Sequence, residues 1–376
     1  MMRGTLLFLL LAAWLPGSGQ VRYVRAISTD ELPQQARGLN KVTSGAEAQH
    51  WCQDLRLRLI EQGWLEASVD STWSVGDTTI CAFHKGPRYL WARLGAGDVP
   101  REISSAARFR ERFYSARPVT PRQMARLYEG LLAECEENGF PFAAIGLDSV
   151  TQRSDGLSAA LHLERGPFTR VDSIIIRGSA RIGARYLRSH IGIKPGDPYR
   201  ESLIAALDKR MRELPFVSQR QAPYVLFTPG MTKVYLFLDA KRASSFNGIL
   251  GVQPDPVSGK VKFTGDLDLR LRNALKHGEA IDLNWRALAD QTQDLKVRYN
   301  HPFIFNTPFG TDLSLKLFKR DSTFLEVALR GALEYLLGRG DKLTGSITQR
   351  SSQRLGRDFS ATPGLGDVKI TSYGLG

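Results

Sequence analysis

The stretch Val261–Arg272 alternates apolar and polar side chains without a break. Successive side chains of an extended strand point to opposite faces, so this stretch predicts a strand with one apolar and one charged face. The apolar face carries Val261, Phe263, Leu267, Leu269 and Leu271, and the other face carries Lys262, Thr264, Asp266, Asp268, Arg270 and Arg272. This pattern is typical of a membrane β-barrel wall with lipid on one side and a wet lumen on the other.

Other strand-length runs repeat this alternation and predict a wall of several strands. They lie at 246–252, 281–287, 295–300, 312–317, 325–335 and 343–348, and residues 367–373 form a candidate eighth strand. Tilted strands of about 9–11 residues suffice to cross the hydrocarbon core of a bilayer. A soluble antiparallel sandwich with one solvated face predicts the same alternation, so the pattern alone leaves that alternative open.

The N-terminus has the pattern of a cleaved export signal, residues 1–19. Arg3 precedes an apolar run at 6–15, and the small residues Gly17 and Gly19 predict cleavage before Gln20. The run is shorter than the roughly 20 residues that a spanning helix needs. An uncleaved anchor is the alternative. The protein is therefore expected to be exported, and to enter a membrane as strands if it enters one.

Charge and cysteine content limit the kinds of partner and the cellular compartment that fit this chain. The net charge of +13 is scattered along the chain, and export argues against nucleic acid as a partner. Three cysteines are an odd number for an exported chain. Cys52 lies on an apolar helical face and Cys81 on an apolar strand face, so the two form either a disulfide or a pair of buried free thiols. Cys135 is expected in a core.

The first half of the chain repeats one pattern. Helix-start signals stand at Ser44, Thr120 and Asp197, at intervals of 76 and 77 residues, and each precedes an amphipathic helix. Pairs of strands are expected after the helices, for example at 67–73 and 78–83, and at 143–150 and 157–163. The same signals recur at the same spacing three times, which indicates a repeat. Each unit is predicted to run strand, helix or helices, strand, strand.

Boundary motifs at 85–89 and 165–169 close the first two units, and a strand at 171–177 opens the third. The predicted segments are 20–86, 87–166 and 167–242 for the three units, and 243–376 for the alternating strands. Arrays of small α+β units are usually binding modules, because their exposed sheet edges can accept a partner strand.

These residues resemble a known family. Residues 192–199, with the apolar helical face that follows and Phe216, resemble the POTRA repeat of outer-membrane insertases, and 171–178 looks like that repeat's opening strand. Residues 299–305 and 308–313 are similar to the early barrel of the BamA/TamA-type proteins. The resemblance implies three α+β POTRA repeats followed by an antiparallel transmembrane β-barrel of which only about the first half is present.

The family's barrels have sixteen strands and a Val-Arg-Gly-Phe or Val-Arg-Gly-Tyr motif in their second half, for which this sequence has no counterpart. A truncated product or an incomplete reading frame is therefore expected. The resemblance implies outer-membrane protein assembly at the bacterial outer membrane, with the POTRA units in the periplasm. The implied partners are unfolded outer-membrane proteins, periplasmic chaperones or accessory assembly subunits, and outer-membrane lipid.

The resemblance also assigns a gate to the first barrel strand. Its candidate substrate-binding residues are Phe246, Asn247, Gly248, Ile249, Leu250, Gly251 and Val252. Backbone groups cannot stay unpaired in lipid, so an incoming strand needs an edge on which to pair. Gly248 and Gly251 would weaken the pairing of such a seam. Alternatively, the two glycines mark a bend or bulge at the domain junction.

We find no motif for catalysis, metal binding or a cofactor, and the chain is expected not to be an enzyme. The six histidines lack metal-ligand spacing, and phosphate-cradling loops are absent from the sequence. Asp266 and Asp268 are expected to pair with lysine or arginine across the strands. Two alternative functions remain: a two-partner-type secretion transporter for a dedicated protein, and a non-catalytic periplasmic binding or structural protein.

Overall fold

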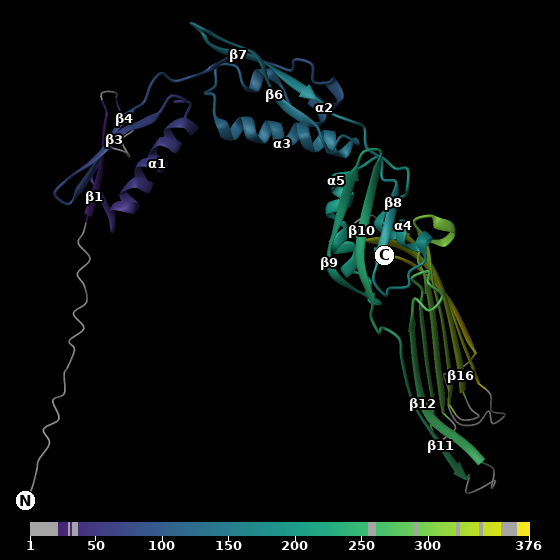
Figure 1. Ribbon diagram of the computed structural model, residues 1–376. Coiled ribbons are helices and arrows are strands. Elements are labelled where there is room, and N and C mark those ends of the chain that lie inside the picture. Colours follow the sequence, from purple (N-terminus) through teal and green to yellow (C-terminus); the bar gives the residue numbers. More distant parts are fainter. Residues whose placement is uncertain are drawn as a thin grey trace, which may run out of the picture. The chain divides into compact units, whose positions relative to one another are not determined.

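The computed structural model describes residues 22–28, 31, 37–254, 261–288, 292–320, 324–337, 341–354 and 367–376 (Figure 1). The predicted export signal lies outside the described residues. The chain forms two compact units. The first consists of the described residues up to Cys135 and of Phe142–Gly166, and the second of Glu136–Pro141 and the described residues from Pro167 onward. Each of the four sheets lies within one of the predicted segments.

The first repeat combines a four-stranded sheet with one helix. Its elements are β1 (Arg22–Ser28), β2 (Asn40–Val42), α1 (Gly45–Glu61), β3 (Ser68–Val75) and β4 (Thr78–His84). The strand order is β2-β1-β4-β3, with β1 parallel to β4. The N–H of Glu47 donates to Ser44 Oγ (3.1 Å), which confirms the predicted helix start. Cys52, Leu55 and Leu59 lie on the buried face of α1, in the core of this repeat.

The second repeat has a three-stranded sheet and a further short helix before its long one. Its elements are β5 (Trp91–Gly95), α2 (Arg101–Ala106), η2 (Glu111–Phe113), α3 (Pro121–Glu137), β6 (Ala144–Arg153) and β7 (Gly156–Glu164). The sheet order is β5-β7-β6, with β5 parallel to β7. The N–H of Gln123 donates to Thr120 Oγ1 (3.3 Å), so the predicted start of α3 is confirmed. The buried face of α3 includes Leu131 and, as predicted, Cys135.

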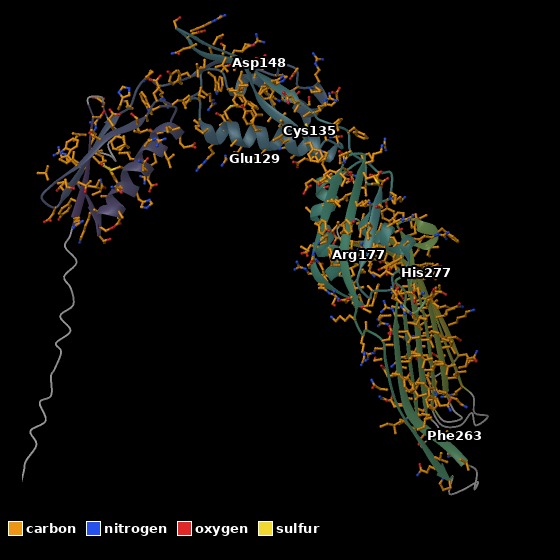
Figure 2. All side chains as sticks on the ribbon, in the orientation of Figure 1. Glu129, Cys135, Asp148, Arg177, Phe263 and His277 are labelled. Atoms are coloured by element: carbon orange, nitrogen blue, oxygen red, sulfur yellow. A yellow bond between two sulfur atoms is a disulfide. The ribbon has the colours of Figure 1, made fainter. Side chains whose placement is uncertain are left out.

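The third repeat packs three short helices on one face of its sheet. Its elements are β8 (Ser173–Arg177), α4 (Ala184–Ile191), α5 (Glu201–Ala205), α6 (Leu207–Arg212), β9 (Val217–Thr228) and β10 (Met231–Ala240). The order is β8-β10-β9, with β8 parallel to β10. Ile191, Leu207, Val234 and Leu236 have no accessible surface and form the centre of its core. Figure 2 labels Arg177 at the end of β8.

The predicted helix start at Asp197 is wrong. The carboxylate of Asp197 accepts a hydrogen bond from the N–H of Lys194 (2.8 Å), and Pro198 forms an isolated bridge with Arg170. Asp197 therefore ends a turn that begins at Lys194, because an aspartate can bond a nearby backbone N–H in a turn as well as at a helix start. The helix α5 begins at Glu201 instead, and the single helix expected here is divided into α5 and α6.

An antiparallel eight-stranded sheet follows. Its elements are β11 (Ser245–Pro254), β12 (Val261–Arg272), β13 (Ala280–Ala287), β14 (Gln293–His301), η3 (Ile304–Asn306), β15 (Phe309–Arg320), β16 (Phe324–Leu336), β17 (Lys342–Arg354) and β18 (Val368–Leu375). The strands are ordered as in the chain, so β11 and β18 form the two edges. The seven predicted strands and the candidate eighth are confirmed. Among the described residues no helix is long and apolar enough to cross a membrane.

The register places apolar side chains in rows across this sheet. One row runs through Leu271, Ile281, Tyr299 and Leu313, which pair in turn from β12 to β15. A soluble sandwich would cover such a face with a second sheet. Here large apolar side chains on this face stay accessible, including Phe263 at 68% (labelled in Figure 2). This exposure favours the lipid-facing wall over the sandwich.

Candidate functional site

The predicted gate residues all lie on β11, at one edge of the sheet. Among the described strands, β11 pairs only with β12. Phe246 lies opposite Leu269, and Val252 opposite Phe263, on the apolar face. Asn247, Ile249 and Gly251 lie on the polar face. The structure therefore brings the seven residues together on one strand, with the alternation that the sequence predicts.

The apolar side chains of β11 are unusually exposed. The accessible fractions are 67% for Phe246, 78% for Ile249, 65% for Leu250 and 66% for Val252. A strand at a sheet edge has a row of backbone N–H and C=O groups that can pair with another strand. The strand β11 therefore combines an available backbone edge with apolar side chains.

The glycines of β11 permit close packing against β12. A Cβ at Gly248 would lie 2.5 Å from Leu267 Cδ2, and a Cβ at Gly251 would lie 2.8 Å from Thr264 Oγ1. The pairing of β11 with β12 runs from Ser245 to Pro254 in one continuous register. The structure therefore gives the glycines a packing role and places no bulge in this ladder.

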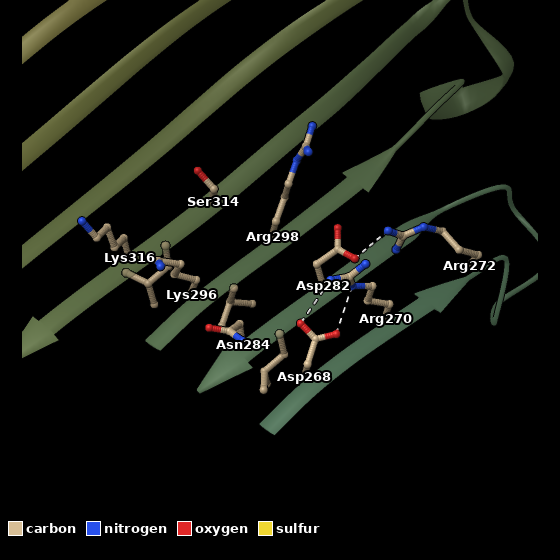
Figure 3. A pocket seen from close by; sticks show the side chains of 12 residues that line it. Asp268, Arg270, Arg272, Asp282, Asn284, Lys296, Arg298, Ser314 and Lys316 are labelled. Atoms are coloured by element: carbon tan, nitrogen blue, oxygen red, sulfur yellow. Dashed lines mark hydrogen bonds and ion pairs between the residues drawn. The ribbon is translucent and has the colours of Figure 1, made fainter. Parts of the chain in front are cut away.

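Ion pairs line the polar face of the sheet. Figure 3 shows part of this face, where charged side chains of β12 to β15 surround a cavity of about 520 Å³. Asp266 pairs with Arg286 across the β12–β13 ladder (2.7 Å), as expected. Asp268 pairs with Arg270 of its own strand instead (3.0 Å). Neighbouring charges of opposite sign keep this face polar, as a wet lumen requires.

The most buried carboxylates of this face share one network. Asp312 and Glu334 are only 2% and 5% exposed. Arg298 binds Asp312 (2.5 Å), and Lys342 binds Glu334 (2.6 Å). The amide of Asn300 donates to Glu334 (3.3 Å), close to the Asp312 carboxylate. A buried carboxylate needs such a partner because its desolvation is costly.

A turn of the sheet is bound to the third repeat within the second compact unit. The turn joins β12 to β13. The N–H of Gly183 donates to the carbonyl of Lys276 (2.9 Å), and the side-chain amide of Asn273 donates to the carbonyl of Arg181 (3.0 Å). Backbone groups from both sides are thereby satisfied. We call this contact the repeat–sheet joint.

A buried carboxylate shapes the turn in this joint. Glu279 is 1% exposed, and its carboxylate accepts hydrogen bonds from the N–H groups of Leu275 (2.5 Å) and His277 (3.0 Å). Figure 2 labels His277. Charge-assisted bonds of this kind are stronger than neutral ones. Glu279 therefore fixes the conformation of the segment that contacts the third repeat.

Aromatic rings complete the joint. Tyr186 of α4 stacks on His190 (centroids 5.8 Å apart) and meets the edge of Phe303 (5.9 Å), which precedes η3. Burial raises the pKa of Tyr186 and lowers the pKa of His190, so both side chains are neutral near pH 7. The rings therefore contribute an uncharged, packed contact between the repeat and the sheet.

The two cysteines of the first repeat are joined. Cys52 on α1 and Cys81 on β4 form a disulfide that links the helix to the sheet, with their Cα atoms 6.4 Å apart. Both residues are buried. The bridge closes a long loop of chain within the repeat.

Metal and histidine chemistry is sparse. Among the described residues, no group of three or more histidine, cysteine, aspartate or glutamate side chains is placed to hold a metal ion. His162 of β7 instead bonds Asp98 (2.7 Å), which also accepts from the N–H of Leu163 (2.8 Å). These contacts attach the loop after β5 to β7. That the chain is not an enzyme stays a prediction.

Sequence reasoning missed the repeat–sheet joint. Tyr186, Gly278, Glu279 and Phe303 come from three separate segments, and no local pattern marks them as neighbours. The sequence does contain one sign of this joint, the short segment 273–279 between two alternating runs. A glutamate in such a tight turn indicates side-chain hydrogen bonds to the backbone.

Comparison with known proteins adds structural neighbours. No family model matches the chain, and no curated protein matches it. Among solved structures, BamA from Haemophilus ducreyi lacking POTRA domains 1–3 matches 75% of the chain with 12% identity and a TM-score of 0.45. CdiB from Escherichia coli matches 88% of the chain with 13% identity and a TM-score of 0.46. POTRA1–3 of Omp85 from Anabaena matches 59% of the chain with 12% identity and a TM-score of 0.27.

The chain spans 56% of the length of that BamA chain, 61% of the CdiB chain and 96% of the Omp85 fragment. The order of α+β repeats followed by antiparallel strands, which the sequence predicts, is confirmed by the strand pairing. Three sheet-and-helix repeats precede one antiparallel sheet whose strands follow the order of the chain.

Proposed function

We propose that the chain is part of a BamA/TamA-type protein that assembles other proteins into the bacterial outer membrane. The three repeats act in the periplasm as POTRA units, and the eight-stranded sheet forms part of a barrel wall in the membrane. The observation that carries this proposal is the position of β11: an edge strand with exposed apolar side chains, next to a sheet face that suits lipid.

The physical argument concerns backbone hydrogen bonds. A chain entering lipid cannot leave its N–H and C=O groups unpaired, since each unpaired group costs several kcal/mol. An edge strand supplies those bonds at once. The strand β11 uses one edge to pair with β12, so its opposite edge is the one on which an incoming strand would pair.

The repeats add edges of their own. In the third repeat β9 is an edge strand of 12 residues, and its Tyr224 and Leu226 are 43% and 40% exposed. Strand addition at such an edge uses main-chain bonds for affinity and side-chain pockets for specificity. The proposed partners are therefore unfolded outer-membrane proteins, brought by periplasmic chaperones or accessory assembly subunits. Outer-membrane lipid surrounds the sheet.

Site-specific photo-crosslinking tests the gate. A photoreactive residue at Asn247 of β11 should crosslink a nascent outer-membrane protein during assembly. The same residue at Lys296 of β14 is the matched control, because β14 is paired on both sides. Equal crosslinking at the two positions, or none at Asn247 while assembly proceeds, would contradict a gate at β11.

Depletion of the gene product tests the function itself. An insertase predicts that many outer-membrane proteins decrease together, because they share one assembly route. A decrease of one secreted protein alone, with the others unchanged, would indicate the two-partner-type transporter instead. No change in either would favour a non-catalytic binding or structural role.

A further inference from the structure

A cavity in the first compact unit is lined by arginine side chains. It has a volume of about 520 Å³ and lies where the end of α1 meets the start of α3 and the segment after α2. Arg122 and Arg126 are one turn apart on α3, and Arg108 follows α2. A cavity of this size is within the range of small-ligand sites.

These arginines lack acidic partners among the residues that the structure describes. Within the described part of the chain, none of Arg108, Arg122 and Arg126 forms an ion pair, whereas Arg93 in the same repeat pairs with Glu111 (3.5 Å). Like charges four residues apart on a helix destabilise it slightly. An anion bound between them would offset that repulsion.

The backbone around the cavity also favours an anion. The helix α3 has 17 residues, and its N-terminus lies at the cavity, where the helix dipole attracts negative charge. Arg108 adopts φ of 57°, a left-handed conformation uncommon for a bulky residue. Such backbone is held in place by the surrounding structure and is frequent at binding sites.

The lining of the cavity also includes a tyrosine and a carboxylate. Tyr114 packs beside Phe109, and burial raises the pKa of the Tyr114 hydroxyl, which therefore keeps its proton. Among the described residues that line the cavity, Glu61 is the one carboxylate. Its charge opposes an anion and gives the site a side chain whose removal should strengthen binding.

We propose that this cavity binds a phosphate group, carried either by a small soluble molecule or by a lipid headgroup. A guanidinium matches the oxygens of a phosphate with two parallel hydrogen bonds, and three arginines around one cavity can contact several oxygens at once. This site is separate from the strand edges of the proposed function and does not depend on them.

Calorimetric titration of the full chain in neutral detergent micelles tests the site. Three probes distinguish the source of the phosphate: inorganic phosphate, glycerol 3-phosphate, and micelles doped with phosphatidylglycerol. Saturable binding of either soluble probe supports a soluble ligand, and binding confined to the doped micelles supports a lipid headgroup. Absence of saturable binding to all three probes would overturn the proposal.

Matched variants show whether the arginines are responsible. The double variant Arg122→Gln with Arg126→Gln should weaken binding about tenfold or more, since each lost charge-assisted bond is a large part of such a contact. The control pair, Arg101→Gln with Arg153→Gln, removes the same charge outside the cavity and should leave binding unchanged. Equal weakening by both pairs would show non-specific attraction and refute the site.

The variant Glu61→Gln should bind phosphate more tightly than the wild type. A misfolded variant would lose binding, so misfolding cannot produce this result. Phosphate binding should become several-fold tighter, because a repulsive charge is removed. A glutamate-rich peptide is titrated in the same way, as an anionic ligand without phosphate. If it binds the wild-type chain more tightly than every phosphate probe, the cavity is a peptide site and the proposal fails.

Discussion

The ring of Tyr186 occupies the space where a side chain of residue 278 would stand. A Cβ built at Gly278 would lie 2.1 Å from Tyr186 Cε2, and Gly278 has φ of 76°. Two requirements therefore meet at one residue: a left-handed backbone and the absence of a side chain. The repeat–sheet joint depends on both.

Gly278→Ala should destabilise this joint. The substitution adds the cost of a left-handed alanine and a clash with a buried ring, together on the order of 1–3 kcal/mol. Gly230→Ala is the matched control, because Gly230 has φ of 79° but no atom within 4 Å of the position that a Cβ would take. Amide hydrogen exchange across 273–279 should rise in the first variant only. Equal effects would show that the ring contact is unimportant.

Gly265→Ala should loosen the proposed gate strand. A Cβ at Gly265 would lie 2.4 Å from the carbonyl oxygen of Ile249, so the β11 backbone must move away from β12. We expect amides of β11 to exchange roughly tenfold faster, which corresponds to about 1.4 kcal/mol. Gly345→Ala on β17 is the control, since nothing lies within 4 Å there. Unchanged exchange in Gly265→Ala would contradict the packing argument.

Reduction of the Cys52–Cys81 disulfide should destabilise the first repeat. The two residues are 29 positions apart, and closing a loop of that length contributes about 3–4 kcal/mol by the chain-entropy argument. Urea unfolding followed by fluorescence with and without dithiothreitol measures the difference. In the variant Cys52→Ser with Cys81→Ser, the reductant should have no effect, and any remaining response would point to Cys135.

His162 should titrate above the ordinary histidine range. The hydrogen bond to Asp98, followed by the attraction of its charge, raises the pKa of His162. The protonated form is favoured in the folded chain, so the pair stabilises the second repeat below pH about 6.5 and loses this contribution as pH rises through the folded pKa. NMR titration of the ring, assigned with His162→Gln, measures the midpoint.

Asp98→Asn is the matched control for that titration. It removes the charge and keeps a similar shape, so the His162 midpoint should fall toward the ordinary value. The pKa of Asp98 itself is lowered, chiefly by the N–H of Leu163. Its own stabilising contribution is therefore present above the usual aspartate range and lost as pH falls. An unshifted His162 midpoint in the wild type would refute the pair.

Local pattern predicted much of this fold. The eight barrel strands follow from period-two alternation, and the starts of α1 and α3 follow from Ser44 and Thr120, because each of these signals acts within a few residues. The error at Asp197 has the same origin: an aspartate side chain can serve a helix start or a turn, and here it bonds the N–H of Lys194 just before Pro198, which bridges to Arg170.

The candidate site also has features that the sequence predicts and features that it does not. The seven residues predicted to form a gate share one strand, so their common position follows from the sequence. The partner of Asp268 did not follow, because the register places Asn284 opposite it on β13, and Arg270 of its own strand is the cation that pairs with it. The repeat–sheet joint brings residues about 90 positions apart into contact, and only the folded chain shows which of them meet.

The strand order of the sheet has a kinetic consequence. Every strand from β11 to β18 pairs with its neighbours in the chain, so each ladder closes only a short loop. Contacts of such small sequence separation form faster than pairings between distant strands. A further hairpin could be added beyond β18, or the last one could open, without breaking any ladder between β11 and β17.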